Sequence, residues 1–165
     1  MIPQIKKILF ATDLSKNSAY AFYYAVHMAK RDEAEIVILH AVEPLPHMLI
    51  SFKDFEHKVA KDRWEDTVKK FKERIQDISV KVDTRMGISS VELISNILIR
   101  LGHPVEEILK AADEEGCDVI VLGTHGKGFL EQTFLGSVSS SVLLRTRKPV
   151  LIVPLPSENT NIDLI

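Results

Sequence analysis

A glycine-rich stretch late in the chain carries the residues best suited to chemistry. Two residues separate Gly123 from Gly126, nine residues separate Gly126 from Gly136, and Ser137 follows directly. The stretch follows an apolar run, 119–122, that predicts a buried strand, and it leads into a segment that predicts the start of a helix. Glycine lets a ligand approach the backbone closely, and a helix N-terminus presents unpaired N–H groups with a partial positive charge. Together these features predict a phosphate-binding site.

The same stretch also fits a simpler interpretation, a surface connection in which Ser137 is an ordinary N-cap. Two other phosphate motifs fail on spacing. A Walker loop ending at Gly126 would need a glycine five residues earlier, and none stands there. A dinucleotide fingerprint would need its third glycine at position 131, which is Glu131.

The amino-acid composition limits the classes of protein to which the chain could belong. A chain of 165 residues with 45% hydrophobic and 27% charged residues is typical of one globular domain, which we expect to span residues 1–156 before a short tail at 157–165. The net charge of −2 gives no electrostatic reason to expect nucleic acid or an anionic membrane as a partner. We expect neither a membrane span nor a signal peptide. The single cysteine, Cys117, cannot form an internal disulfide and is interpreted as a small buried residue, so we expect a cytoplasmic location.

Strands and helices are predicted to alternate along the chain, which favours a parallel α/β sheet with helices on both faces. Strands are expected at 5–10, 35–42, 79–84, 96–102, 118–122 and 149–154. Helices are expected at 18–30, 51–77, 103–112 and 137–145. The region 79–102 admits either a hairpin or a strand, a short helix and a strand. Prolines at both ends of the last strand favour an edge position.

Three candidate segments follow or end predicted strands. Asp13 comes after the first strand, residues 40–42 end the second, and Gly123 follows the strand 118–122. Ligands of such sheets bind beyond the carboxyl ends of the strands, where the strand order reverses. We therefore expect these segments to share one edge, and their convergence favours a nucleotide-type ligand.

The chain resembles the universal stress protein family along nearly its whole length. Segments 8–15, 38–42, 102–108 and 148–153 are similar to the family's first strand and acidic turn, second strand, third-helix start and last strand. The spacing from Gly123 to Ser137 matches the pattern of the ATP-binding branch without a gap. The resemblance implies a doubly wound, Rossmann-like five-stranded parallel sheet in the order 3-2-1-4-5. Two departures stand out: Ala11 where the family often has proline, and residues from about Met86 to Ser95, which look like an insertion.

The resemblance also implies contacts with ATP. The adenine edge would pair with the backbone of Ala41. The ribose and phosphates would meet the turn residues Ala11, Thr12 and Asp13, where Asp13 could bind ribose hydroxyls or help to hold a divalent ion. The ribose and α-phosphate side would be lined by Leu122, Gly123 and Gly126. The terminal phosphates would be bound by the N–H groups and hydroxyls of Gly136, Ser137, Val138 and Ser139, with Mg²⁺ or Mn²⁺ held mainly by the phosphates.

Other polar and aromatic residues have plainer interpretations. His125 is interpreted as a loop residue beside the ligand, and Lys127 as either a phosphate contact or an exposed lysine. His40 at a strand end and Trp64 in the long charged helix are interpreted as packing residues. No pair of histidines has metal-ligand spacing on one element, so we expect no metal site made by protein side chains alone.

The sequence is compatible with three functions. The first is an ATP-binding stress-response module whose nucleotide state sets its conformation or its partners. The second is a slow ATP hydrolase or phosphotransferase, for which Asp13 and Lys127 would be the candidate residues. The third is a nucleotide-free interaction protein acting as a dimer. The resemblance implies a homodimer formed through the last strand, Pro149–Pro154.

Overall fold

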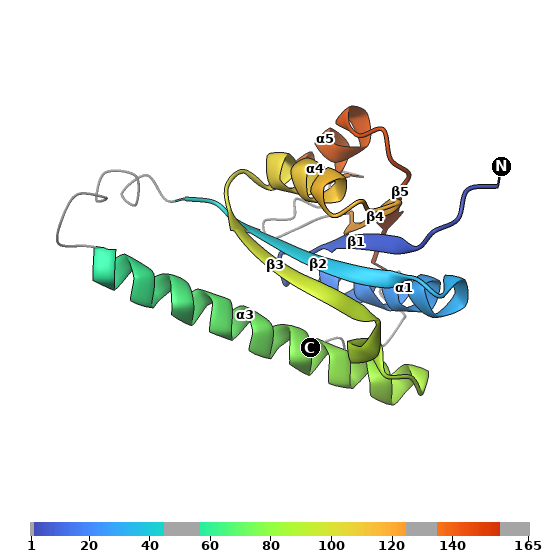
Figure 1. The fold of residues 1–165 in the computed structure, drawn as a ribbon, viewed down its shortest axis with the longest axis horizontal. Helices are drawn as coiled ribbons and strands as arrows, with labels where there is room; N and C mark the ends of the chain where they lie inside the picture. The colour runs from blue at the N-terminus through green and yellow to red at the C-terminus, as the bar shows by residue number, and fades with distance from the viewer. Residues whose placement is uncertain (1, 45–56, 125–134, 156–165) are drawn as a thin grey trace.

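The computed structural model describes residues 2–44, 57–124 and 135–155, which form one sheet between two layers of helices (Figure 1). The strands are β1 (Lys7–Ala11), β2 (Glu35–Val42), β3 (Ile94–Leu101), β4 (Val119–Gly123) and β5 (Val150–Val153). All pairings are parallel, in the order β3-β2-β1-β4-β5. The expected doubly wound sheet and its strand order are confirmed, as is the edge position of the last strand.

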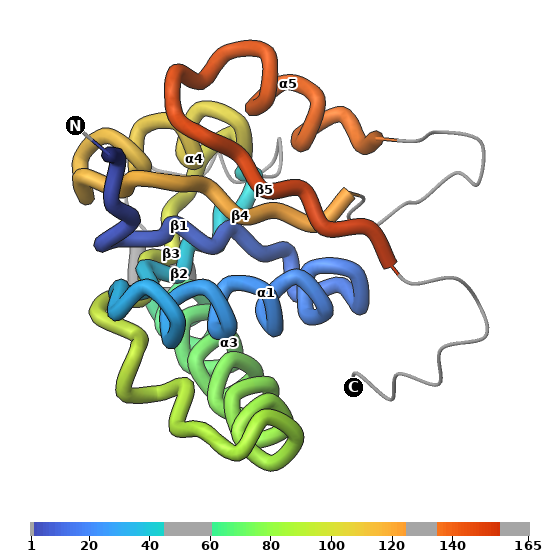
Figure 2. Tube along the Cα trace, turned by 90° about the vertical axis from the view of Figure 1, so that its right-hand side faces the viewer, coloured from blue at the N-terminus to red at the C-terminus, as the bar shows by residue number. Residues whose placement is uncertain are grey.

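The helices cover both faces of this sheet (Figures 1 and 2). One face carries α1 (Lys16–Asp32) and α3 (His57–Met86), and the other carries α4 (Pro104–Glu114) and α5 (Ser137–Arg145). Helix boundaries follow local chemistry: α4 starts with proline in its first turn, and Gly116, with φ +64°, lies just beyond its end. The predicted bounds of α5 agree with the structure at both ends.

The core has two parts because the sheet is buried on both faces. Ile8 and Phe10 of β1 pack into the cluster that contains α1 and α3, whereas Leu9 and Ala11 pack into the cluster that contains α4 and α5. Successive side chains of a strand point to opposite faces, so a strand buried on both sides must be apolar throughout. This accounts for the uninterrupted apolar runs in the sequence.

The predicted strand at 79–84 is wrong, because α3 continues through it to Met86. The alternation of apolar and polar residues there is local: Val82 is fully buried, but Val80 is 57% exposed. The helix ends where Gly87 takes a φ of +65°, a conformation that costs glycine little. A short 3₁₀ turn, η1 (Ser90–Leu93), then leads into β3, so the hairpin alternative is also wrong.

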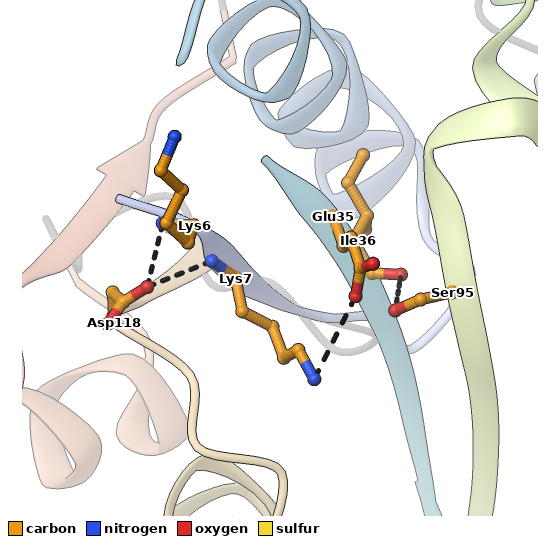
Figure 3. Close-up of polar contacts among 6 residues, drawn as sticks. All are labelled: Lys6, Lys7, Glu35, Ile36, Ser95 and Asp118. Carbon is orange, nitrogen blue, oxygen red and sulfur yellow. Dashed lines mark hydrogen bonds and ion pairs between the residues drawn. The ribbon is translucent and has the colours of Figure 1, made fainter. Parts of the chain in front are cut away.

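Asp118 stabilises the amino edge of the sheet through hydrogen bonds (Figure 3). Its Oδ2 accepts hydrogen bonds from the main-chain N–H groups of Lys6 and Lys7, at 2.8 and 2.9 Å. The Lys7 ammonium also lies 3.8 Å from the Glu35 carboxylate at the start of β2. These contacts connect β1 to both of its neighbours at the edge opposite the candidate site, and they help to set its register.

We predict that Asp118→Ala lowers the free energy of unfolding by about 1–3 kcal/mol, because two main-chain donors lose their acceptor. Urea denaturation measures this loss. Asp113→Ala is the matched control: its side chain is 80% exposed and lies 3.6 Å from Lys148, so the change should stay within about 0.5 kcal/mol. Equal losses in the two variants would show that the Asp118 contacts contribute nothing specific.

Candidate functional site

At the carboxyl edge of the sheet the central strand, β1, ends before both of its neighbours. β1 ends at Ala11, opposite Leu39, whereas β2 continues to Val42. On the other side β1 pairs with β4 only as far as Val121, and β4 continues to Gly123. α1 leaves β1 over one face of the sheet and α4 reaches β4 over the other, which is the arrangement at which α/β sheets bind ligands. The segments predicted to share one edge do so.

The main chain of Ala41 faces the space beyond the end of β1. The N–H of Thr12 donates to the carbonyl of Leu39 at 2.9 Å, so the main-chain groups of Leu39 point toward β1. Main-chain groups alternate sides along a strand, so those of Ala41 point the same way. Within the described part of β1, no residue pairs with Ala41. Its N–H and carbonyl are therefore placed where a planar ligand edge could bond to them.

The turn from β1 into α1 is built by its own side chains. The Thr12 hydroxyl lies 2.8 Å from that of Ser18 and accepts from the N–H of Leu14 at 3.0 Å. The Asp13 carboxylate accepts from the N–H of Ser15 at 3.0 Å, and Ser15 caps α1. Leu14 has a φ of 63°, which non-glycine residues rarely adopt. The sequence expectation for Thr12 and Asp13 named ligand contacts; the structure adds that both side chains shape the turn.

A contact that the sequence did not suggest joins α1 to the end of β4. Asn17, in the first turn of α1, donates from Nδ2 to the Thr124 hydroxyl at 2.9 Å, and both residues are buried. A Cβ built on Gly123 would lie only 3.2 Å from the main-chain carbon, Cγ and Oδ1 of Asn17. Asn17 Oδ1 is itself buried and accepts no hydrogen bond from the described residues. A side chain at position 123 would therefore require Asn17 to shift by a few tenths of an ångström, whatever the role of Gly123 toward a ligand.

The start of α5 is fixed to the same point. The N–H of Gly136 donates to the Thr124 carbonyl at 2.7 Å, and the Ser139 hydroxyl donates to the Gly123 carbonyl at 2.7 Å. Gly136 is the N-cap and has no side chain to bond the first turn, and Ser140 is the first residue whose N–H bonds back into the helix. The N–H groups of residues 137–139 thus have no acceptor inside the helix, and they carry its partial positive charge.

The residues predicted to contact phosphate differ in their exposure and in their hydrogen bonds. Ser139 is buried and its hydroxyl hydrogen is directed at Gly123, so its free donor is the main-chain N–H. Ser137 is exposed. The side chain of Leu122 is buried in the core, which leaves its main chain at the edge. Gly126 lies outside the described residues, as do His125 and Lys127, so the expectations for them stay predictions.

Two residues outside the glycine stretch match their plainer interpretations. The ring of His40 stacks on Phe71, with centroids 4.7 Å apart and planes 9° from parallel, which confirms packing. His40 Nδ1 also lies 2.7 Å from the Thr12 carbonyl, so it helps to position the turn. Cys117 is buried, and desolvation raises the pKa of its thiol to about 11, which keeps it protonated and unreactive near neutral pH.

Among residues 2–44, 57–124 and 135–155, no group of three or more His, Cys, Asp or Glu side chains is arranged to hold a metal ion. In the same ranges no helix is long and apolar enough to cross a membrane.

Comparison with known proteins points to one family. Residues 4–154 match the model of the universal stress protein family. The universal stress protein MJ0577 of Methanocaldococcus jannaschii is 29% identical over 165 residues, covering 90% of this chain and 94% of that protein. Its solved structure superposes with a TM-score of 0.71, covering 93% of this chain and 99% of that one.

Two further solved structures share the fold at lower identity. A universal stress protein in complex with cAMP is 22% identical, with a TM-score of 0.60 and coverage of 93% of this chain and 100% of that one. The universal stress protein of Archaeoglobus fulgidus in complex with dAMP is 19% identical, with a TM-score of 0.54 and coverage of 93% and 99%.

We predict that Gly123→Ala lowers the free energy of unfolding by about 1–3 kcal/mol, because the added methyl group overpacks against Asn17. Chemical denaturation measures the loss. Adding Asn17→Ala to the same chain removes two of the three close atoms and should recover part of the stability lost to the methyl group, relative to Asn17→Ala alone. Purely additive losses would contradict the packing argument.

Proposed function

The chain belongs to the universal stress protein family, and on this premise we propose that it is an ATP-binding stress-response module whose nucleotide state sets its conformation or its partners. The observation that carries the proposal is the uncapped start of α5, which is tied to the end of β4 beside the shortened strand β1. Free N–H groups at a helix N-terminus suit phosphate, and an open strand edge suits a base. Two relatives of known structure hold adenine nucleotides, cAMP and dAMP, which supports an adenine nucleotide here.

In this proposal each part of the edge takes one part of the ligand. The adenine pairs with the main chain of Ala41. The ribose lies between the turn of Ala11, Thr12 and Asp13 and the strand end at Leu122 and Gly123, with Gly126 beyond it. The terminal phosphates meet the N–H groups that begin at Ser137 and continue through Val138 and Ser139. Mg²⁺, or Mn²⁺, accompanies the nucleotide and is held mainly by phosphate oxygens.

Binding is favoured over hydrolysis as the primary function. Asp13 is the described candidate for positioning a water molecule, and its carboxylate already accepts the N–H of Ser15 in the turn. A hydrolase needs a group free to orient the nucleophile and a charge to stabilise the transition state. Any turnover in this proposal is slow. We propose a cytoplasmic location, consistent with a single cysteine that can form no internal disulfide.

We also propose a homodimer formed through β5. This strand lies at the edge of the sheet, and its residues Val150, Leu151 and Ile152 are each partly exposed. The carbonyls of Pro149 and Val153 accept from β4, so by alternation the main-chain groups of Val150 and Ile152 point outward. Unpaired groups on an edge strand can bond to a second strand.

We predict that Gly136→Val abolishes ATP binding and leaves the fold intact. The backbone at Gly136 has φ −66° and ψ 159°, which valine adopts without strain, so the glycine is not needed for the turn itself. Its side chain would stand where phosphate must approach the N–H groups. Calorimetric titration with Mg·ATP measures the loss, and Arg147→Val, at an exposed site beyond the other end of α5, is the control.

Unchanged affinity in Gly136→Val would overturn the proposed site. Mass spectrometry of the purified protein tests the nucleotide-free alternative, because a bound adenine nucleotide would be carried through purification. Robust phosphate release with Mg²⁺ that is lost in Asp13→Ala would instead favour the hydrolase.

For the dimer, we predict that Ile152→Pro yields monomers while the free energy of unfolding changes by less than about 1 kcal/mol, since it removes an outward N–H. Leu151→Pro removes an N–H that faces β4 and should cost about 3 kcal/mol or more. Sedimentation measures the oligomeric state, and chemical denaturation measures the free energy of unfolding. A dimer that persists in Ile152→Pro with unchanged affinity would contradict the β5 interface.

A further inference from the structure

Helix α3 is longer than the sheet beneath it. Its 30 residues span about 45 Å at 1.5 Å per residue, whereas the 8 residues of β2 span about 26 Å. Its second half packs on the core through Phe71, Ile75 and Val82. Its first half runs past the carboxyl ends of β2 and β3 (Figure 1). Much of this first half therefore lies beyond the sheet.

The overhanging half keeps an apolar stripe. No side chain from 61 to 70 is fully buried. Trp64 and Val68 are partly buried and belong to neither core cluster of the described residues. Both continue the spacing of four and three residues that runs on through Phe71 and Ile75. A groove of about 510 Å³ lies along this face, lined by Trp64, Glu65, Val68, Lys69, Lys72, Glu73 and Gln76.

One charged pair on this face, Glu65 and Lys72, complements a reversed copy of itself. Glu65 and Lys72 are equally far from the peptide that joins Val68 to Lys69. Glu65 has only an exposed partner on its own helix, Lys61 at 3.9 Å, and Lys72 makes no ion pair with a described residue. In an antiparallel pair of helices related by a two-fold axis at that peptide, each Glu65 faces the other chain's Lys72. The same axis brings the two Val68 residues together, next to the Trp64 side chains. It also brings the two Lys69 residues together, and each of these ammonium groups lies 4.0 Å from Glu73 of its own helix.

We propose that the groove face of α3, residues 61–76, is an interface for a second copy of this chain, with the two α3 helices antiparallel about a two-fold axis beside Val68. An isologous contact makes every favourable pair twice, which is why a self-complementary pattern favours a second copy over another partner. One helix face is small for an interface, so the association is weak and depends on concentration. It is separate from the β5 dimer and does not depend on nucleotide binding.

Fluorescence of Trp64, the single tryptophan of the chain, tests the proposal directly. We expect its emission to shift to shorter wavelength as protein concentration rises from about 1 μM to about 1 mM, as the indole loses water. Glu65→Lys and Lys72→Glu should each weaken the association about tenfold, and the double variant should restore it to within about threefold of the parent. The β5 contact does not reach Trp64, so it leaves this signal unchanged. Emission that is independent of concentration, or a double variant as weak as the single ones, overturns the proposal.

Disulfide trapping gives an independent test. Val68→Cys places two thiols at the axis, and mild oxidation should produce a covalent dimer. Gln76→Cys is the matched control on the same face, because antiparallel pairing sets its two copies about 22 Å apart along the helices. The native Cys117 is buried, with its pKa raised to about 11, and does not compete. Equal trapping at the two positions, or none at Val68→Cys, overturns the proposal.

Discussion

The structure depends on the junction at Gly123 and Thr124, where four elements meet. Asn17 of α1 bonds the Thr124 side chain, and the Val153 carbonyl of β5 accepts the Thr124 N–H. The Thr124 carbonyl in turn accepts the N–H of Gly136 at the start of α5. Every polar group of Thr124 is thereby used. These bonds position the start of α5, so the proposed phosphate site depends on a buried threonine.

The junction at Gly123 and Thr124 also contains a destabilising feature. Asn17 Oδ1 is buried without a hydrogen bond from the described residues, and an unsatisfied buried acceptor costs about 1–3 kcal/mol. A smaller residue at 17 would avoid that cost but would lose the bond to Thr124 and leave a void under Gly123. The opposite edge has no such tension, because both donors that meet Asp118 are satisfied at 2.8 and 2.9 Å. Asn17 Oδ1 and the φ of 63° at Leu14 both lie at the edge where function is proposed.

The sequence predicted the sheet well because its signals are local and redundant. Buried parallel strands are apolar throughout, and Gly116 and Pro104 mark helix ends whose geometry needs them. The failed strand at 79–84 had only alternation in its favour. The spacing of Phe71, Ile75 and Val82 already placed that segment on a helix, and no glycine or proline interrupts it before Gly87. Asn17 was missed for another reason: its partner Thr124 lies 107 residues away, and no short motif encodes such a contact.

Gly123 and Gly136 belong to one motif, but they differ in their structural surroundings. A Cβ at position 123 would lie 3.2 Å from Asn17, which is a tight contact within the folded chain and involves no ligand. Gly136 has a backbone that any residue could adopt, and the first turn of α5 has no side-chain cap. A serine or aspartate there would stabilise the helix by about 1 kcal/mol by capping it. The chain forgoes that gain, and the N–H groups of this turn receive no cap from the side chain of residue 136. Gly136 therefore supports a phosphate ligand more strongly than Gly123 does, although both glycines belong to the same sequence pattern.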